Sequence, residues 1–195
     1  MRFIFAATIS AFATLHPCND VEAQGRTTTT AQPRAVSSGT AAVFTAAPRA
    51  ATQELEVISG RAAISINPSL WKETKSTQGN QRIFQHIGGD AYAMVITERI
   101  PTTLNELRER ALNDARETDP DLKIVEEKLR RVNGTDLLML RIEGKVDGIP
   151  MAVLGYYYSG LSGTVQVLTC TRPRLFRKYH RDFEDFLNGF HLTLK

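Results

Sequence analysis

The side chains that could carry out covalent chemistry are few, and their spacing matches no complete catalytic motif. Ser69–Lys72 spells the S-x-x-K motif of penicillin-recognising enzymes, but the S-D-N and K-T-G boxes that accompany it do not occur. Gly160–Thr164 misses the nucleophile elbow because threonine stands where the last glycine is required. The sequence also holds neither a P-loop nor a G-x-G-x-x-G fingerprint. We therefore expect no catalytic residue and predict that the protein is not an enzyme.

Histidines and cysteines show no spacing typical of metal ligands. His86, His180 and His191 form no H-x-x-x-H or H-E-x-x-H pair. Cys170 has no CxxC partner, and it alternates with Leu168 along a predicted strand. A cysteine in that setting is usually a buried, unreactive thiol. We expect no metal site and no cofactor.

The most distinctive charged group is a cluster of five cations around the start of the last predicted helix. Its members are Arg172, Arg174, Arg177, Lys178 and Arg181. Acidic residues follow at Asp182, Glu184 and Asp185, the reverse of the order that a helix dipole favours. Exposed N–H groups at the start of a helix, together with these cations, are suited to binding an anion. The sequence thus predicts a site for a phosphate-bearing lipid, an acidic glycan or an acidic protein, with a solvated helix face as the alternative.

A pocket between helix and sheet is the alternative candidate site. Its polar or aromatic residues would be Tyr156, Tyr157, Tyr158 and His86. Such a pocket would serve a small-ligand-binding domain or a weak hydrolase. Tyrosines at the end of a strand more often pack their rings and leave the hydroxyl in water, so this interpretation requires two titratable groups that converge.

Composition places the chain among ordinary globular proteins. Of its 195 residues, 42% are apolar and 23% are charged, which excludes disorder throughout the chain. The 24 basic and 21 acidic residues leave a net charge of only +3, so we expect no nucleic-acid partner. Two cysteines exclude a disulfide-rich scaffold.

The N-terminus has the pattern of an export signal. Arg2 is followed by an uncharged apolar run of 13 residues, Phe3–Leu15, which is shorter than the ~20 residues needed to span a bilayer. Val21–Ala23 places small residues at the positions that signal peptidase reads, so we predict a signal peptide over residues 1–23. Lipid modification of Cys18 or a buried N-terminal element are the alternatives. No later apolar run is long enough to cross a membrane. We expect an exported protein that is periplasmic or secreted, with association to a membrane through an anionic lipid or glycan as an option.

Residues 24–54 are rich in Thr, Ala, Ser and Pro and predict a disordered linker. As far as Thr52 their only charges are Arg26, Arg34 and Arg49, and their one aromatic residue is Phe44. Such a segment buries too little apolar surface to offset the entropy of ordering it. A glycosylated stalk or a wall-spanning spacer is the alternative. Residues 55–195 then form a single α+β domain.

Within that domain, alternating apolar residues and turn signals predict seven strands. They are Val57–Ile66, Arg82–Ile87, Tyr92–Thr97, Lys123–Val132, Asp136–Glu143, Ile149–Tyr158 and Thr164–Thr171. Gly88–Asp90 is a hairpin signal, and Asn133-Gly134 suits a type I′ turn. Short connections of this kind make a sheet mainly antiparallel.

Two amphipathic helices complete the pattern. Thr103 and Glu106 fit a capping box that opens the first helix, and Asp119-Pro120 ends it. The second helix follows Pro173 and carries a stripe of Phe176, Tyr179, Phe183, Phe186, Leu187 and Phe190. The fold class is therefore α+β: a mainly antiparallel sheet of six to seven strands covered by the two helices, on two faces or on one.

The residues from about 55 to 195 resemble the Mog1/PsbP-like family, including the small exported bacterial members of the PsbP/DcrB-like fold. The matching features are the turn Pro68–Trp71, the hairpin that leads to Ile100-Pro101, and Asn133–Thr135 at the opening of a meander. The closing helix also matches, with Tyr179, Asp182, Phe183, Phe186, Leu187 and Phe190.

The resemblance implies a sandwich fold and a protein without catalytic activity. One branch of the family is an extrinsic accessory subunit of photosystem II, and another binds a small nuclear GTPase; neither partner can be carried over residue by residue. Together with the export signal, this implies an accessory or binding module of the cell envelope. Its partner would be an envelope protein or an anionic surface.

Overall fold

A computed structural model describes residues 53–161 and 163–193. The predicted signal peptide 1–23, Cys18 and all but the last two residues of the predicted linker lie outside the described residues. The first strand begins at Gln53, so regular structure starts slightly before the predicted boundary at residue 55.

The described residues form ten strands, two α-helices and one 3₁₀-helix. Up to the first helix the strands are β1 (Gln53–Ile58), β2 (Ala62–Ile66), β3 (Trp71–Thr74), β4 (Gln81–His86) and β5 (Ala91–Glu98). Then come α2 (Leu104–Thr118), β6 (Lys123–Val132), β7 (Thr135–Val146), β8 (Ile149–Gly160) and β9 (Gly163–Thr171). The chain ends in η1 (Pro173–Leu175), α3 (Phe176–Leu187) and β10 (Phe190–Leu192).

The strands form two antiparallel sheets. The larger sheet has seven strands in the order β3-β4-β5-β9-β8-β7-β6, and the smaller has three in the order β1-β2-β10. Most neighbours are consecutive in the chain, but β9 returns from the β6–β8 meander to pair with β5, and β10 returns to β2. The predicted fold class, α+β with a mainly antiparallel sheet, is confirmed.

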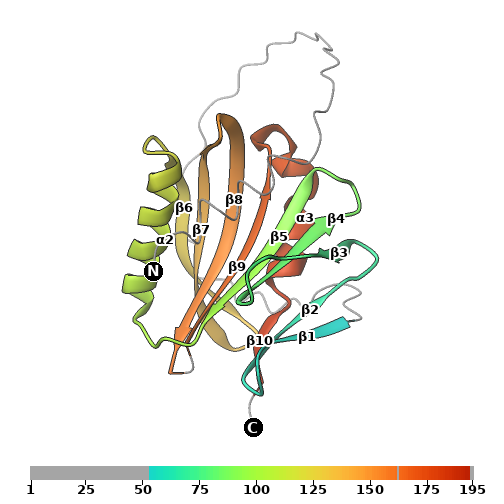
Figure 1. Cartoon of the computed structure of the whole chain (residues 1–195), viewed down its shortest axis with the longest axis vertical. Helices are drawn as coiled ribbons and strands as arrows, with labels where there is room; N and C mark the ends of the chain where they lie inside the picture. The colour runs from blue at the N-terminus through green and yellow to red at the C-terminus, as the bar shows by residue number, and fades with distance from the viewer. Residues whose placement is uncertain (1–52, 162, 194–195) are drawn as a thin grey trace, which may run out of the picture.

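The two helices pack on opposite faces of the seven-stranded sheet (Figure 1). Side chains alternate along each strand, so one face packs on α3 and the small sheet, and the other packs on α2. On the α3 side lie Phe84, Val95, Leu137, Leu154 and Val167. On the α2 side lie Met94, Leu140, Ile142, Val153 and Leu168. Of the two arrangements that the sequence left open, the structure has one helix on each face.

The predicted strand Val57–Ile66 is wrong as a single element. It is a hairpin of β1 and β2, because Gly60 has φ +64° and turns the chain, and Arg61 N–H donates to Ile58 O at 2.9 Å. A Ser-Gly pair inside the run was the available turn signal. The strand β3, which begins at Trp71, was predicted only as part of a turn.

The apolar stripe of the last helix ends earlier than predicted. Phe190 belongs to β10, not to α3, and pairs with Ile64 of β2. The Asn133 amide nitrogen donates to the carbonyls of Asn188 and Phe190, at 2.8 Å in each case. These bonds hold the end of α3 against the turn between β6 and β7, and thereby set where the helix lies on the sheet.

Candidate functional site

Four of the five predicted cations form one stripe on the solvent side of η1 and α3. Arg174, Arg177, Lys178 and Arg181 are exposed, whereas Arg172, between β9 and η1, is half-buried. Their spacing of three, one and three residues places them along one helix face, over about 10 Å. We call these four residues the basic stripe.

The opposite side of α3 fixes the direction in which the basic stripe points. Five side chains are buried against the sheet: Phe176, Tyr179, Phe183, Phe186 and Leu187. Trp71 packs edge-on against Phe186, with ring centroids 5.0 Å apart. Because this aromatic face is in the core, the basic stripe must face away from the sheet.

The cations and acids of α3 differ in their partners. Within residues 53–161 and 163–193, no acidic oxygen lies within ion-pair distance of Arg177, Lys178 or Arg181. The acids that follow are held by the sheet: Glu184 lies 3.0 Å from Arg130, and Asp182 lies 3.3 Å from His86.

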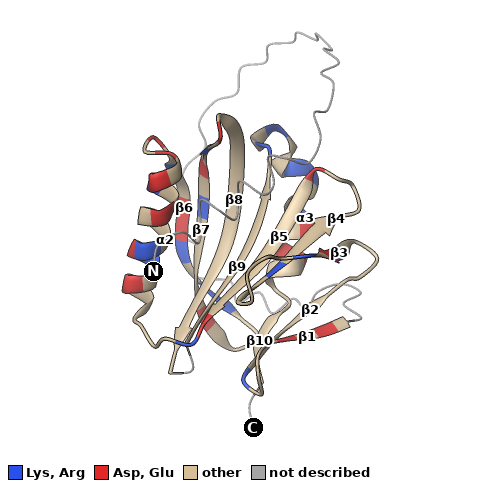
Figure 2. Ribbon diagram, in the orientation of Figure 1, with Lys and Arg blue, Asp and Glu red and all other residues tan. Residues whose placement is uncertain are grey.

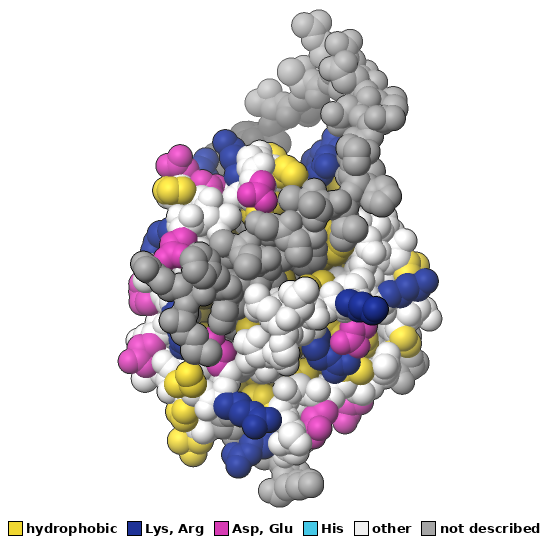
Figure 3. Space-filling view, in the orientation of Figure 1, with side chains coloured by type: hydrophobic (Ala, Val, Ile, Leu, Met, Phe, Trp, Pro, Cys, Tyr) yellow, Lys and Arg dark blue, Asp and Glu magenta, His cyan; other side chains and the backbone are white. Residues whose placement is uncertain are grey.

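Two further electrostatic contacts of the basic stripe are with residues of α3 itself. The Lys178 ammonium lies 4.7 Å from the centroid of the Tyr179 ring, a cation–π contact that leaves its charge at the surface. Burial raises the pKa of Asp185, and the nearby Arg181 partly offsets the increase. Figure 2 shows Lys and Arg where the chain enters α3 and acidic residues further along the helix. By contrast, the described part of the face in Figure 3 mixes both signs of charge.

Two backbone donors at the start of α3 are already used. The N–H of Leu175 donates to Arg172 O at 2.9 Å, and the N–H of the first α-helical residue, Phe176, donates to Pro173 O. The 3₁₀ turn therefore satisfies two of the N–H groups that were expected to face an anion. Binding of an anion here would depend on the side chains of the basic stripe.

The predicted pocket residues do not converge. Tyr156 and Tyr158 lie on the α3 side of β8, whereas Tyr157 is fully buried on the α2 side. The Tyr156 hydroxyl donates to Asn188 Oδ1 at 3.3 Å, and burial raises its pKa to about 12. Burial also raises the pKa of Tyr157. These tyrosines are packed core residues, and strand alternation explains their separation.

His86 lies at the end of β4 in an aromatic environment. Its ring packs edge-on against Trp71 and Tyr179, with centroids 4.9 and 5.0 Å away. Nδ1 accepts the Gly88 N–H at 3.0 Å, so Nε2 carries the proton of the neutral ring and points to Asp182. The Nε2–Oδ2 contact lacks good hydrogen-bond geometry. Burial lowers the pKa of His86, and Asp182 partly opposes this effect.

Asp182 is the member of this group that the sequence analysis did not identify as a partner of His86. The two residues come from α3 and β4, and no local pattern links them. Their contact joins α3 to β4, the strand next to the sheet edge at β3.

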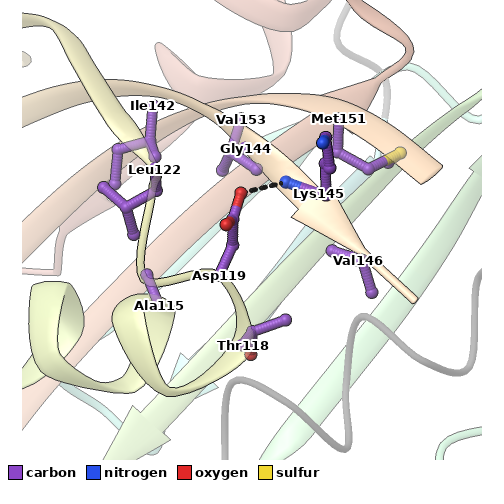
Figure 4. A pocket seen from close by; sticks show the side chains of 10 residues that line it. All are labelled: Ala115, Thr118, Asp119, Leu122, Ile142, Gly144, Lys145, Val146, Met151 and Val153. Atoms are coloured by element: carbon purple, nitrogen blue, oxygen red, sulfur yellow. Dashed lines mark hydrogen bonds between the residues drawn. The ribbon is translucent and has the colours of Figure 1, made fainter. Parts of the chain in front are cut away.

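A small cavity lies between the end of α2 and strands β7 and β8 (Figure 4). Its volume is about 30 Å³, whereas ligand pockets usually enclose ~300–1,000 Å³. Asp119 ends α2 beside it and accepts the Lys145 N–H at 2.7 Å. Tyr156–Tyr158 and His86 do not line it. The cavity has room for a water molecule rather than a substrate.

Cys170 is buried on the α2 side, as predicted, and burial raises its pKa to about 12. In the described part of the chain, no three His, Cys, Asp or Glu side chains come together in a way that could hold a metal ion. None of the helices described there combines the length and apolar character needed to cross a bilayer.

Comparison with known proteins gives similarity at the level of structure. No family model matches the sequence, and no curated protein matches it. Cyanobacterial PsbP (CyanoP) from Synechocystis sp. PCC 6803 superposes with a TM-score of 0.57 at 12% identity, over 73% of this chain and 93% of its own.

Two further solved structures are similar at TM-scores below 0.5. PA94 of Pseudomonas aeruginosa, of unknown function and a putative regulator, has a TM-score of 0.48 at 12% identity, over 63% of this chain and 85% of its own. LpqN of Mycobacterium tuberculosis, involved in cell envelope biogenesis, has a TM-score of 0.42 at 9% identity, over 68% of this chain and 83% of its own. The fold assignment rests on the cyanobacterial protein, and the described domain has the PsbP/Mog1-like fold.

Proposed function

We propose that this protein is an exported, non-catalytic accessory module of the cell envelope that docks onto an anionic surface through the basic stripe. The observation that carries the proposal is the asymmetry of α3. Its cations Arg177, Lys178 and Arg181 face solvent without acidic partners among the described residues. By contrast, Asp182 and Glu184 contact the sheet.

The sequence pattern of the N-terminal residues supports export and a flexible attachment of the domain. Residues 1–23 have the features of a signal peptide, and residues 24–52, which precede β1, have the composition of a flexible tether. Such a tether would let the domain contact a surface at some distance from an anchored partner. The PsbP-like fold supports an accessory role by analogy only, because one fold hosts many functions.

The size of the expected effect follows from the charges. Each Lys or Arg close to an anionic membrane contributes about 1 kcal/mol at moderate ionic strength. The four exposed cations of the basic stripe then contribute about 4 kcal/mol, which corresponds to roughly a thousandfold in affinity. Because the interaction is electrostatic, it weakens as the Debye length falls from ~30 Å at 0.01 M salt to ~8 Å at 0.15 M.

Co-sedimentation with phosphatidylglycerol vesicles tests the proposal. The variant R174A/R177A/K178A/R181A should lose binding by roughly a thousandfold. The matched control K72A/K75A/R99A/R116A removes the same number of exposed cations elsewhere and should bind within a few-fold of the unmodified protein. Equal losses in both variants would show that net charge alone governs binding and would refute a specific stripe.

A protein partner is distinguished by fractionation. If the unmodified protein does not bind vesicles, docking on lipid is excluded. Release of the protein from an envelope fraction by high salt would then indicate an acidic protein surface. Retention of the stripe variant in that fraction, at the level of the control, would exclude the basic stripe as the docking site.

A further inference from the structure

The strand β6 is an open edge of the seven-stranded sheet. Among residues 53–161 and 163–193, it pairs with β7 on one side and with no strand on the other. It has ten residues, whereas the opposite edge strand, β3, has four. Natural sheets usually keep such edges short or cover them, because a row of free N–H and C=O groups can pair with another chain. Leu129, in the middle of β6, is 70% exposed.

The turn after β6 determines which backbone groups point outward. Asn133 and Gly134 have φ values of 48° and 80°, the signature of a type I′ turn, and Val132 pairs with Thr135 across it. In such a hairpin the closing pair exchanges hydrogen bonds, and hydrogen-bonded pairs alternate along the ladder. The N–H and C=O groups of Glu127, Leu129 and Arg131 therefore point to the free edge.

The side chains of these residues form a self-complementary row. Glu127 contacts Arg108 of α2 at 2.6 Å, which places Glu127, Leu129 and Arg131 on the α2 side of the strand. Read in the opposite direction, the row Glu-Leu-Arg becomes Arg-Leu-Glu. An antiparallel copy of β6 would thus place a glutamate opposite an arginine on each side of a central leucine pair.

We propose that a second copy of this chain pairs with β6 in antiparallel orientation, with a two-fold axis at Leu129. The Leu129 residues of the two copies exchange backbone hydrogen bonds and cover each other's side chains. Glu127 of each copy faces Arg131 of the other, and opposite charges directly across an antiparallel pair are stabilising. The two sheets become one continuous sheet.

Pairing of the two β6 strands in a neighbouring register is less favourable than pairing about Leu129. An axis at Lys128 would place lysine opposite lysine, and an axis at Glu127 would place glutamate opposite glutamate. In the proposed register Lys128 faces Arg130 of the second copy on the α3 side. Each of these cations is already paired within its own copy, with Glu126 and Glu184 respectively.

A β-bulge limits the length of the interface. The register of β6 against β7 shifts between Ile124 and Glu126, so regular pairing is confined to the segment from Glu126 to Val132. An interface of this length lies at the small end of specific protein contacts. We therefore expect a weak dimer that forms with increasing protein concentration.

Disulfide trapping tests the position of the axis. The Cα atoms of a hydrogen-bonded antiparallel pair lie ~5.5 Å apart, within the range of a disulfide. In a Cys18→Ser background, Leu129→Cys should give a covalent dimer under mild oxidation. The matched control Ile87→Cys, which replaces a residue that is 57% exposed in the turn after β4, should remain monomeric. Equal cross-linking of both variants would refute the proposed interface.

Charge reversal tests the register. Sedimentation equilibrium of the full chain should show association from 21.7 kDa towards twice that mass. Arg131→Glu and Glu127→Arg should each weaken self-association by about tenfold or more, because each places like charges opposite one another twice. An equimolar mixture of the two variants should recover a heterodimer, since every facing pair is again of opposite charge.

A backbone variant separates edge pairing from side-chain contacts. Leu129→Pro removes an N–H that points outward and leaves the ladder with β7 intact, as proline is tolerated at such edge positions. It should abolish the dimer while far-UV circular dichroism remains that of the unmodified protein. A monomer at every concentration, or a dimer that survives both Leu129→Pro and Arg131→Glu, would overturn the proposal.

Discussion

Gly189 occupies the point where the chain leaves α3 and returns to the small sheet. A Cβ atom at this position would lie 2.0 Å from Ser65 O and 3.1 Å from Phe186 O. Both obstacles are backbone atoms, which cannot rotate away as a side chain can. Ser65 N–H also donates to Gly189 O at 2.9 Å, so any separation that relieves the clash stretches this bond. The substitution Gly189→Ala is therefore expected to displace β10 from β2.

The cost can be worked out from these contacts. Real Cβ contacts are rarely shorter than 3.0 Å, so the two chains must separate by about 1 Å. Overpacking of this kind costs ~1–3 kcal/mol, and a weakened backbone hydrogen bond adds ~1 kcal/mol. We expect Gly189→Ala to lower the free energy of unfolding by about 2–4 kcal/mol. For a domain of this size the melting temperature should fall by roughly 8–16 °C.

Urea and thermal unfolding followed by circular dichroism provide the measurement. Gly79→Ala is the matched control, because no heavy atom lies within 4 Å of the Cβ it would add and its backbone needs no positive φ. It should leave stability unchanged or raise it slightly, since alanine restricts the unfolded chain. If both variants melt together, the close approach of Gly189 to Ser65 does not support the fold, and the reasoning is refuted.

Three further predictions concern single groups. Burial lowers the pKa of His86, so the unfolded chain takes up the proton first and the free energy of unfolding should fall as pH drops below about 6.5. The dependence of this free energy on pH should be weaker in His86→Phe, and an identical dependence in both proteins would contradict this. The thiol of Cys170 has a pKa near 12, so in a Cys18→Ser variant it should not react with Ellman's reagent at pH 8 until urea unfolds the protein. Reaction in the folded state would show an accessible thiolate. Thr103→Ala should lower the free energy of unfolding in urea by about 1 kcal/mol, because the Thr103 hydroxyl accepts the Glu106 N–H at 3.2 Å. An unchanged free energy would mean that water replaces the cap.

Elements defined by local chemistry could be predicted from the sequence. The capping box at Thr103 begins α2 as expected, and Asp119 ends it. The strand predicted at Lys123–Val132 has the same bounds in the structure, because the Asn133-Gly134 turn requires positive φ at both residues. In each case a few adjacent residues impose the geometry by sterics or by a single hydrogen bond.

Elements defined by distant contacts could not be predicted in this way. The segment Phe190–Leu192 becomes a strand only because β2 is there to pair with it, and its three residues carry no pattern of their own. The pairing of β5 with β9 depends on the whole β6–β8 meander closing back on the sheet. Such pairings arise from tertiary packing, which overrides local propensity.

In the candidate site, too, local features could be predicted from the sequence and distant contacts could not. Helical periodicity was enough to distinguish the basic stripe from the buried helix face that carries Phe176, Tyr179 and Phe183. It could not show that Glu184 and Asp182 contact the sheet, because Arg130 and His86 come from distant strands. The grouping of Tyr156–Tyr158 into one pocket was an error that the two-residue period of a strand could have corrected.

The proposed dimer and the proposed docking surface are geometrically compatible. A two-fold axis perpendicular to the joined sheet keeps both α3 helices on one side, so both basic stripes would face in the same direction. Two stripes on one rigid body bind a surface with higher avidity than either alone. Arg131→Glu leaves every residue of the stripe in place, yet it should make vesicle binding less steep with protein concentration. Unchanged steepness in a variant shown to be monomeric would mean that the edge pairing, if present, serves a purpose other than surface docking.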